Sequence, residues 1–223
     1  MALILNIETS TKNCSVGLAK DGECIYLKEE NKGDYSHAEK LHIFIEEALK
    51  SENLKAKDLD AIAVGKGPGS YTGLRIGVST AKGLAYAINK PLISVDTLKA
   101  LAKNIQVKQG IIVPMIDARR LEVYSAIFNL NHEYVRGPEA EIIDEHSYQS
   151  LLAENPVYFL GDGALKCKGI IQHTNANFID NKFPSAQEMA FLAEEKYQEK
   201  HFEDTAYFEP FYLKDFMVTP QKK

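Results

Sequence analysis

The pattern of apolar and polar positions predicts an α/β chain whose first half contains five strands. Short apolar runs predict strands at residues 3–7, 14–19, 23–27, 61–64 and 91–95. Asp21-Gly22 separates the second and third runs, and an Asp-Gly pair between apolar runs is a strong hairpin signal. Apolar residues three and four apart predict three helices. The first begins at Asp34 or Ser36, the second runs from the glycine-rich stretch after residue 64 to Asn89, and the third begins at Asp96 or Thr97.

The second half of the chain repeats this order. Apolar runs predict strands at 111–116, 122–128, 133–135 and 157–160, with a helix near 147–153 before the last of them. Aligning Ile7-Glu8 with Ile116-Asp117 brings the two predicted hairpins almost into register, with little residue identity. We therefore predict two duplicated lobes of mixed sheets flanked by helices, at residues 1–103 and 104–223. We also predict a final helix at 185–200, with Ser185 as its N-cap. The last residues of the chain either belong to the second lobe or pack back against the first.

The most distinctive stretch is the glycine loop, residues 65–77, which reads GKGPGSYTGLRIG. It lies between an apolar strand and a helix, an arrangement that lets backbone N–H groups approach an anion at the helix N-terminus. It is neither a Walker A sequence nor a dinucleotide fingerprint, because Thr72 stands where the latter needs a third glycine. A tight strand-to-helix connection without a ligand is an equally good interpretation at this point.

Composition and charge narrow the class of protein. The chain has 223 residues, three cysteines and a formal net charge of −5. An odd cysteine number argues against a disulfide framework, so we expect reduced thiols in a cytoplasmic protein. We see neither a secretory signal nor the ~20 apolar residues that span a bilayer. Without a basic stripe, tight independent RNA binding is not expected, although a contributory patch stays open.

Four motifs carry a resemblance to known proteins. They are Ile7-Glu8-Thr9-Ser10, residues 67–77 of the glycine loop, Asp117-Ala118-Arg119 with Glu122-Val123-Tyr124, and Glu209-Pro210-Phe211-Tyr212-Leu213. The order of elements resembles the actin-like ATPase fold (ASKHA, RNase H-like), and the motifs resemble the TsaB (YeaZ) family. The resemblance covers nearly the whole chain.

The resemblance implies a non-catalytic scaffold or activating subunit. Its implied partner is a TsaD-type enzyme that transfers threonylcarbamoyl to adenosine 37 of tRNAs reading ANN codons. A TsaE-type ATPase joins the pair, and a TsaC-type synthase supplies the adenylate. On this basis ATP and Mg²⁺ are expected on partner subunits, and tRNA is reached through the complex rather than directly.

Residues of a degenerate nucleotide cleft can also be named. The candidates are Glu8, Thr9, Ser10, Gly67, Gly69 and Asp117. Glu8 replaces the usual Asp of actin-like ATPases, and the second hairpin (residues 117–121) has no glycine to allow close approach of phosphate. We therefore expect no independent ATP hydrolysis, no catalytic residue and no tightly bound cofactor on this chain. A small-molecule kinase or ATPase of the same fold is the alternative.

A metal site is not expected, because the spacing of the histidines is wrong for one. His37 and His42 are five residues apart, which places them on different faces of a helix, whereas a two-histidine site on one helix needs a spacing of four. A metallopeptidase is therefore the least favoured alternative.

Two helices carry a predicted partner interface. Small residues recur every four positions in the second helix, beside larger apolar ones, and the first helix has its own apolar stripe; the candidates are Leu41, Ile45, Ala48, Gly73, Leu74, Gly77, Val78, Ala81 and Ala85, with Tyr86 beside them. Docked on two equivalent helices, they would form a four-helix interface with the TsaD-type protein, or a homodimer when that partner is absent. Packing of the stripe on the chain's own sheet is the open alternative.

Overall fold

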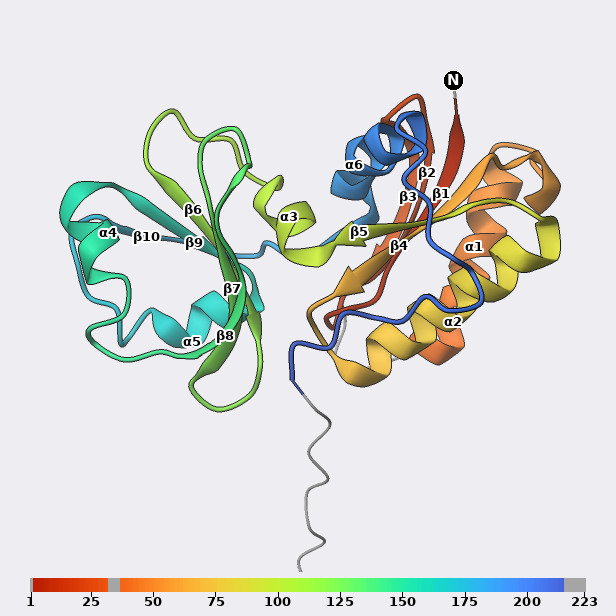
Figure 1. Ribbon diagram of the computed structural model, residues 1–223. Coiled ribbons are helices and arrows are strands. Elements are labelled where there is room, and N and C mark those ends of the chain that lie inside the picture. Colours follow the sequence, from red (N-terminus) through yellow and green to blue (C-terminus); the bar gives the residue numbers. More distant parts are fainter. Residues whose placement is uncertain (1, 32–36, 215–223) are drawn as a thin grey trace, which may run out of the picture.

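The computed structural model describes residues 2–31 and 37–214 and contains two five-stranded sheets (Figure 1). The first sheet has the order β3-β2-β1-β4-β5. Its strands are β1 (Leu3–Glu8), β2 (Cys14–Lys20), β3 (Glu23–Glu30), β4 (Ala61–Gly67) and β5 (Leu92–Asp96). Strands β1, β2 and β3 pair antiparallel, whereas β4 and β5 join in parallel, so the sheet is mixed as predicted.

The second sheet repeats the first. Its strands are β6 (Ile111–Asp117), β7 (Glu122–Phe128), β8 (Tyr134–Ile142), β9 (Val157–Leu160) and β10 (Ala176–Ile179). Read from β8, the order β8-β7-β6-β9-β10 matches that of the first sheet strand for strand, with the same parallel and antiparallel pairs. The duplicated actin-like architecture is therefore confirmed.

The helices differ in length between the lobes. They are α1 (His37–Ser51), α2 (Tyr71–Ile88), α3 (Thr97–Ala102), α4 (Gln149–Glu154), α5 (Asp162–Cys167) and α6 (Ala186–Gln198), with a 3₁₀ turn at Ala56–Asp58. Helices α1 and α2 bury their apolar sides together with β1, β2 and β4 in one core. Ser70 caps α2 by accepting a hydrogen bond from the Gly73 N–H at 3.3 Å.

Helix α6 completes the first lobe rather than the second. Met189, Leu192 and Ala193 of this helix pack with residues of β1, β4 and β5 on the sheet face opposite α1 and α2 (Figure 1). Ser185 caps it, as predicted, by accepting a hydrogen bond from the Gln187 N–H at 3.2 Å. The predicted boundary places this helix in residues 104–223 and leaves open that the last residues pack against the first lobe, as α6 does here. The apolar pattern of an amphipathic helix does not say which sheet the helix covers.

After α6 the chain forms a C-terminal strap, residues 202–214, which runs along α2 and ends between the lobes (Figure 1). The Glu203 N–H donates to the Leu92 carbonyl at 2.8 Å, and the Phe211 N–H donates to the Lys66 carbonyl at 2.7 Å. Lys214 then forms an ion pair with Glu122 of β7 at 2.5 Å. The strap therefore fastens to both lobes.

Local details of the first hairpin agree with the sequence except at one residue. Asp21 and Gly22 both have positive φ, at 55° and 82°, as the Asp-Gly turn requires. A regular hairpin around Asp21-Gly22 would pair Cys14 with Glu29, but a bulge at Ile25 shifts the register so that Cys14 faces Glu30. The predicted start of the first helix at Asp34 or Ser36 lies outside the described residues. Helix α5 and strand β10 were not predicted, because each is only one turn or four residues long.

Candidate functional site

The carboxylate of Glu8 lies at the end of β1, fully buried beneath the glycine loop. Its Oε1 accepts a hydrogen bond from the Ser10 N–H at 2.7 Å, and its Oε2 accepts one from the Thr97 hydroxyl at 3.3 Å. A Cβ atom at Gly65 would collide with this carboxylate. Burial away from water raises the pKa of Glu8. The side chain therefore supports the loop from below instead of facing a ligand.

The glycines of the loop receive the chain's own backbone. A Cβ atom at Gly69 would overlap the Ser10 carbonyl oxygen, and one at Gly73 would overlap that of Thr9. At Gly67, where φ is +109°, the added atom would lie 2.9 Å from the Phe211 carbonyl oxygen of the strap. Each glycine thus allows a close backbone contact within the protein, which explains the richness of the loop in glycine.

Hydrogen bonds close the same contacts. The Ser70 N–H, at the entrance of α2, donates to the Ser10 carbonyl at 2.6 Å. The Thr9 hydroxyl donates to the Gly73 carbonyl at 2.8 Å. A helix N-terminus binds an anion through free N–H groups, and here the chain already occupies part of that set. Part of the N-terminal N–H set of α2 is therefore used within the chain, as in a tight strand-to-helix connection.

A cleft of about 390 Å³ opens between the lobes, beside the loop. Its walls come from the end of β1, the start of α2, the β6–β7 turn and the strap: Ser10, Thr11, Gly69, Ser70, Tyr71, Thr72, Ile116, Asp117, Ala118, Arg119, Tyr124, Asp162, Phe211, Tyr212, Leu213 and Lys214. Of the predicted cleft residues, Ser10, Gly69 and Asp117 line it. Glu8, Thr9 and Gly67 do not, because they lie beneath the loop or under the strap.

The acids of the cleft already have partners. Asp117 forms an ion pair with Lys166, and Glu122 at its edge pairs with Lys214. Asp162 accepts a hydrogen bond from the Asp117 N–H at 3.0 Å, and burial raises its pKa. These contacts hold the second lobe's turn and the strap together.

The β6–β7 turn has an unusual backbone. Arg119 and Arg120, which we call the arginine turn, both have positive φ, at 72° and 52°. Left-handed backbone costs a non-glycine residue about 1–2 kcal/mol. The Asp117 carboxylate holds the turn by accepting a hydrogen bond from the Arg119 N–H at 2.8 Å. No glycine stands here, as the sequence indicated, and both side chains are exposed.

The predicted partner interface is wrong in its residues. Leu41, Ile45, Ala48, Gly73, Leu74, Gly77, Val78, Ala81 and Ala85 are all buried within the first lobe. The small residues let α2 lie close to the end of β1, because a Cβ atom at Gly73 or Gly77 would overlap Thr9. The alternative that the sequence left open, packing on the chain's own lobe, is the observed one.

The opposite side of the same two helices is exposed. Ile43 on α1 is 53% exposed and Tyr86 on α2 is 82% exposed. Gly83 of α2 is also exposed. It lies within the helix, and a Cβ atom there would meet open space. We call Ile43, Gly83 and Tyr86 the outer face of α1 and α2. Of these three residues only Tyr86 was predicted from the sequence. The signals for Ile43 and Gly83 are an apolar residue and a helix-breaking residue that lie away from the buried stripe.

The two histidines of α1 lie in different surroundings. His37 is buried, and its Nε2 lies 2.8 Å from the Thr11 carbonyl oxygen, whereas His42 is exposed. Across residues 2–31 and 37–214 no group of three potential metal ligands occurs. Within the same residues no helix is long and apolar enough to cross a membrane.

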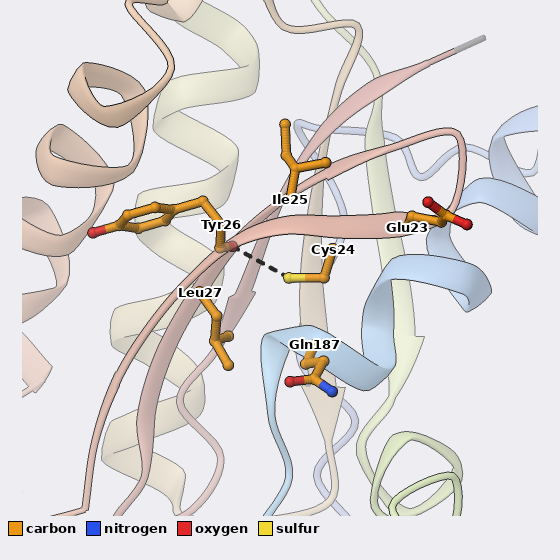
Figure 2. Close-up of a pocket in the computed structure, with 6 residues that line it drawn as sticks. All are labelled: Glu23, Cys24, Ile25, Tyr26, Leu27 and Gln187. Atoms are coloured by element: carbon orange, nitrogen blue, oxygen red, sulfur yellow. Dashed lines mark hydrogen bonds between the residues drawn. The ribbon is translucent and has the colours of Figure 1, made fainter.

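A second hollow lies along the edge strand β3, lined by residues 23–27 and Gln187 of α6 (Figure 2). Its volume is about 490 Å³, larger than that of the cleft between the lobes. Cys24 lies at its centre and donates a hydrogen bond from Sγ to the Tyr26 carbonyl at 3.2 Å (Figure 2). Burial raises the pKa of this thiol, which disfavours a reactive thiolate. Cys24 therefore does not make this hollow a candidate catalytic site.

Comparisons with known proteins identify the family. Residues 32–221 match a family model described as "TsaD: tRNA N6-adenosine threonylcarbamoyltransferase". TsaB of Bacillus subtilis (strain 168) is 32% identical over 210 residues, which cover 86% of this chain and 87% of that protein. TsaB of Haemophilus influenzae is 32% identical over 226 residues, covering 95% and 93%. The chain belongs to the TsaB family.

Both TsaB relatives are named tRNA threonylcarbamoyladenosine biosynthesis proteins. Among solved structures, YeaZ from Pseudomonas aeruginosa superposes with a TM-score of 0.80 at 26% identity, covering 96% of this chain and 100% of that one. A second Pseudomonas aeruginosa structure, of an uncharacterized protein with similarity to the peptidase YEAZ, gives a TM-score of 0.83 at 24% identity and the same coverage. The two-lobed fold is thus shared along nearly the whole TsaB-like chain.

Proposed function

We propose that this chain is a non-catalytic subunit of the machinery that makes threonylcarbamoyladenosine in tRNA. It binds a TsaD-type enzyme and stabilises the active arrangement of that enzyme, which transfers threonylcarbamoyl to adenosine 37 of tRNAs reading ANN codons. A TsaE-type ATPase joins the assembly and ATP with Mg²⁺ binds to the partner subunits. The protein works in the cytoplasm, in keeping with its three free cysteines.

One observation carries the non-catalytic part of the proposal. In an actin-like ATPase, phosphate must approach backbone N–H groups at the turns of both lobes. Here the glycines of the first lobe receive the backbone of Thr9, Ser10 and Phe211, and the second lobe presents the arginine turn. A triphosphate would have to displace the protein's own main chain. This supports a scaffold over a kinase or ATPase.

The outer face supports the binding part. Burying large exposed side chains such as Ile43 and Tyr86 against a partner is favourable in free energy, because it removes apolar surface from water. An exposed mid-helix glycine costs about 1 kcal/mol relative to alanine, and it lets another helix approach closely. The outer face thus replaces the buried stripe as the surface on which a helix pair of the TsaD-type protein docks. In the absence of that protein, the same surface pairs with a second copy.

The binding proposal is tested with Ile43→Glu and Tyr86→Glu, singly and together. We expect each to weaken co-purification with the TsaD-type protein, and the double variant to abolish it, while thermal melting stays unchanged. The matched control is Leu165→Glu on α5, because Leu165 is also 53% exposed. Undiminished co-purification of the double variant would show that the enzyme docks elsewhere.

The functional proposal is tested in cells. Depletion of the chain should lower the threonylcarbamoyladenosine content of tRNA, measured by mass spectrometry of tRNA nucleosides, and the double variant should fail to restore it. Calorimetry of the isolated chain with Mg-ATP addresses the alternative. Tight binding with turnover would support a small-molecule kinase or ATPase instead.

A further inference from the structure

The basic residues of the chain are divided unevenly between lysine and arginine. The chain has 26 lysines and arginines, of which only Arg75, Arg119, Arg120 and Arg136 are arginines. Arg136 is bound inside the second lobe, to Glu141 at 2.6 Å and to Ser125 at 3.2 Å. Of the other three, Arg119 lines the cleft between the lobes, and Arg75 lies over the ring of Tyr71, which also lines it. Arg120 follows Arg119 in the exposed arginine turn. Three of the four arginines therefore belong to the cleft or to its immediate neighbours in the chain.

The arginine turn presents two exposed cationic side chains. Among the described residues no carboxylate forms an ion pair with Arg119 or Arg120, whereas the acids beside them, Asp117 and Glu122, already hold Lys166 and Lys214. Both arginines also adopt left-handed backbone, which glycine would adopt without strain. Two successive residues with positive φ are typical of a tight hairpin turn, and here both are arginines, although glycine and asparagine are the residues usually found there. The strain is retained where two guanidinium groups face solvent.

Aromatic groups line the same cleft as Arg119. The guanidinium of Arg75 lies over the ring of Tyr71, with 4.9 Å between Cζ and the ring centroid. The Tyr71 ring lies 5.0 Å from that of Tyr212, which is partly exposed. Guanidinium groups bind phosphates bidentately, and arginine planes and aromatic rings stack with unpaired bases. The combination is typical of contacts with RNA loops rather than with a free anion.

We propose that the arginine turn contacts the phosphodiester backbone of RNA. The inference rests on the proposed function, because the RNA concerned is the tRNA that the TsaD-type enzyme holds. A chain with net charge −5 does not hold RNA tightly by itself, so the contact adds to that of the enzyme. Arg119 and Arg120 steer and orient the tRNA, and Tyr212 with Arg75 forms the adjacent stacking surface.

The test uses an unmodified transcript of a tRNA that reads ANN codons, with binding followed by fluorescence anisotropy over a range of salt. The variant Arg119→Gly with Arg120→Gly removes both guanidinium groups and relieves the strained backbone. We expect it to melt at the same or a higher temperature than the native chain. Its complex with the TsaD-type protein should bind the transcript about ten-fold more weakly, with a salt slope shallower by about 0.9 for each phosphate that is no longer neutralised.

Two further variants sharpen the test. Arg119→Lys with Arg120→Lys keeps the charge without the bidentate geometry and should bind with intermediate affinity. Lys55→Ala with Lys57→Ala removes two exposed charges at the far end of α1 and should bind like the native chain. An unchanged affinity and salt slope for the glycine variant would overturn the proposal. The proposal would also be overturned if the glycine variant lost binding of inorganic phosphate or ATP but bound the tRNA transcript as the native chain does. The arginine turn would then bind free phosphate instead of RNA.

The two proposals fail in distinguishable ways. The glycine variant should still co-purify with the TsaD-type protein, because the arginine turn lies on the other lobe from the outer face. If the complex forms and tRNA binding is unchanged, only the RNA contact is wrong. If the native chain forms no complex, the proposed function fails. The RNA contact is then tested by the salt dependence of tRNA binding to the isolated chains, and equal slopes for the native chain and the glycine variant refute it.

Discussion

The two lobes share one strand order but differ at the turn that follows the fourth strand. In the first lobe, the glycine loop leads into α2, a helix of 18 residues. In the second lobe, Gly161 and Gly163 lead into α5, a helix of six residues. Both turns pack against the end of the first strand of their own sheet: a Cβ atom at Gly73 would overlap Thr9, and one at Gly161 would overlap Met115. The glycines are therefore a packing device of the duplicated fold.

The difference lies in what each lobe presents to the outside. The first lobe has grown two long helices whose outer face exposes Ile43 and Tyr86. The second lobe keeps short helices and presents the arginine turn. We infer that duplication kept the internal architecture and let the surfaces diverge, one toward an apolar partner and the other toward a charged one. Substitutions that act on one lobe at a time test this division.

The largest effect is expected at Gly73. Replacement by alanine puts a Cβ atom into the Thr9 carbonyl oxygen, a backbone atom that cannot turn away, and should lower the free energy of unfolding by about 3 kcal/mol. The control is Gly83→Ala in the same helix, where the added atom meets open space; it should raise stability by about 1 kcal/mol. Urea denaturation measures both.

The same experiment in the second lobe tests whether the packing device is shared. At Gly163 an added Cβ atom would lie 2.8 Å from the backbone carbon of Ile116. We expect Gly163→Ala to cost about 2 kcal/mol. A cost near zero would mean that the second lobe does not rely on its glycines, and the comparison of the lobes would break there.

A smaller, pH-dependent effect is expected at Glu8. The folded state raises its pKa above 4.5, the value for an unburied glutamate, so its carboxyl is protonated in both states below that pH. As the pH rises from 4.5 through the folded pKa, the unfolded chain ionises first and stability is lost. Glu8→Gln removes this dependence, so the stability of the variant relative to the native chain should rise as the pH increases from 4.5 through the folded pKa. Unfolding curves measured at a series of pH values check this, and parallel curves would contradict it.

The smallest effect is expected at Lys214, whose ion pair with Glu122 links the strap to the second lobe. Both side chains are partly exposed, so Lys214→Ala should cost less than about 1 kcal/mol. Its signature is local: the Phe211 amide, which donates to Lys66, should exchange hydrogen faster. Lys168→Ala, which breaks an exposed pair with Asp180, is the control and should leave that amide unchanged.

Much of this fold could be predicted from the sequence because its signals are local. Asp21-Gly22 fixes the first hairpin, and Ser70 and Ser185 cap their helices through side-chain hydrogen bonds within three residues. The order of strands follows from the apolar runs, and their duplication from the repeat of that order. Such features need no knowledge of distant parts of the chain.

The site could be predicted only in outline, because its meaning depends on distant contacts. The glycine loop reads the same whether its glycines admit a phosphate or the carbonyl groups of Thr9 and Ser10. The stripe containing Ala81 and Ala85 reads the same whether it faces a partner or a sheet. The strap lies against Lys66 although Phe211 is far from it in the sequence. A pattern of residue types names a surface, but not what covers it.

The position of α6 has a consequence for how the protein is made. Met189 and Leu192 of α6 pack in one cluster with Ile4 and Ile93 of the first sheet. The ribosome therefore synthesises the helix that completes the first sheet only after the whole second lobe. The second lobe is thus an insertion within the first, and it can reach its native structure on the nascent chain while its neighbour still waits for a missing layer. Early strands of the first lobe, such as β1, spend that interval with one apolar side uncovered.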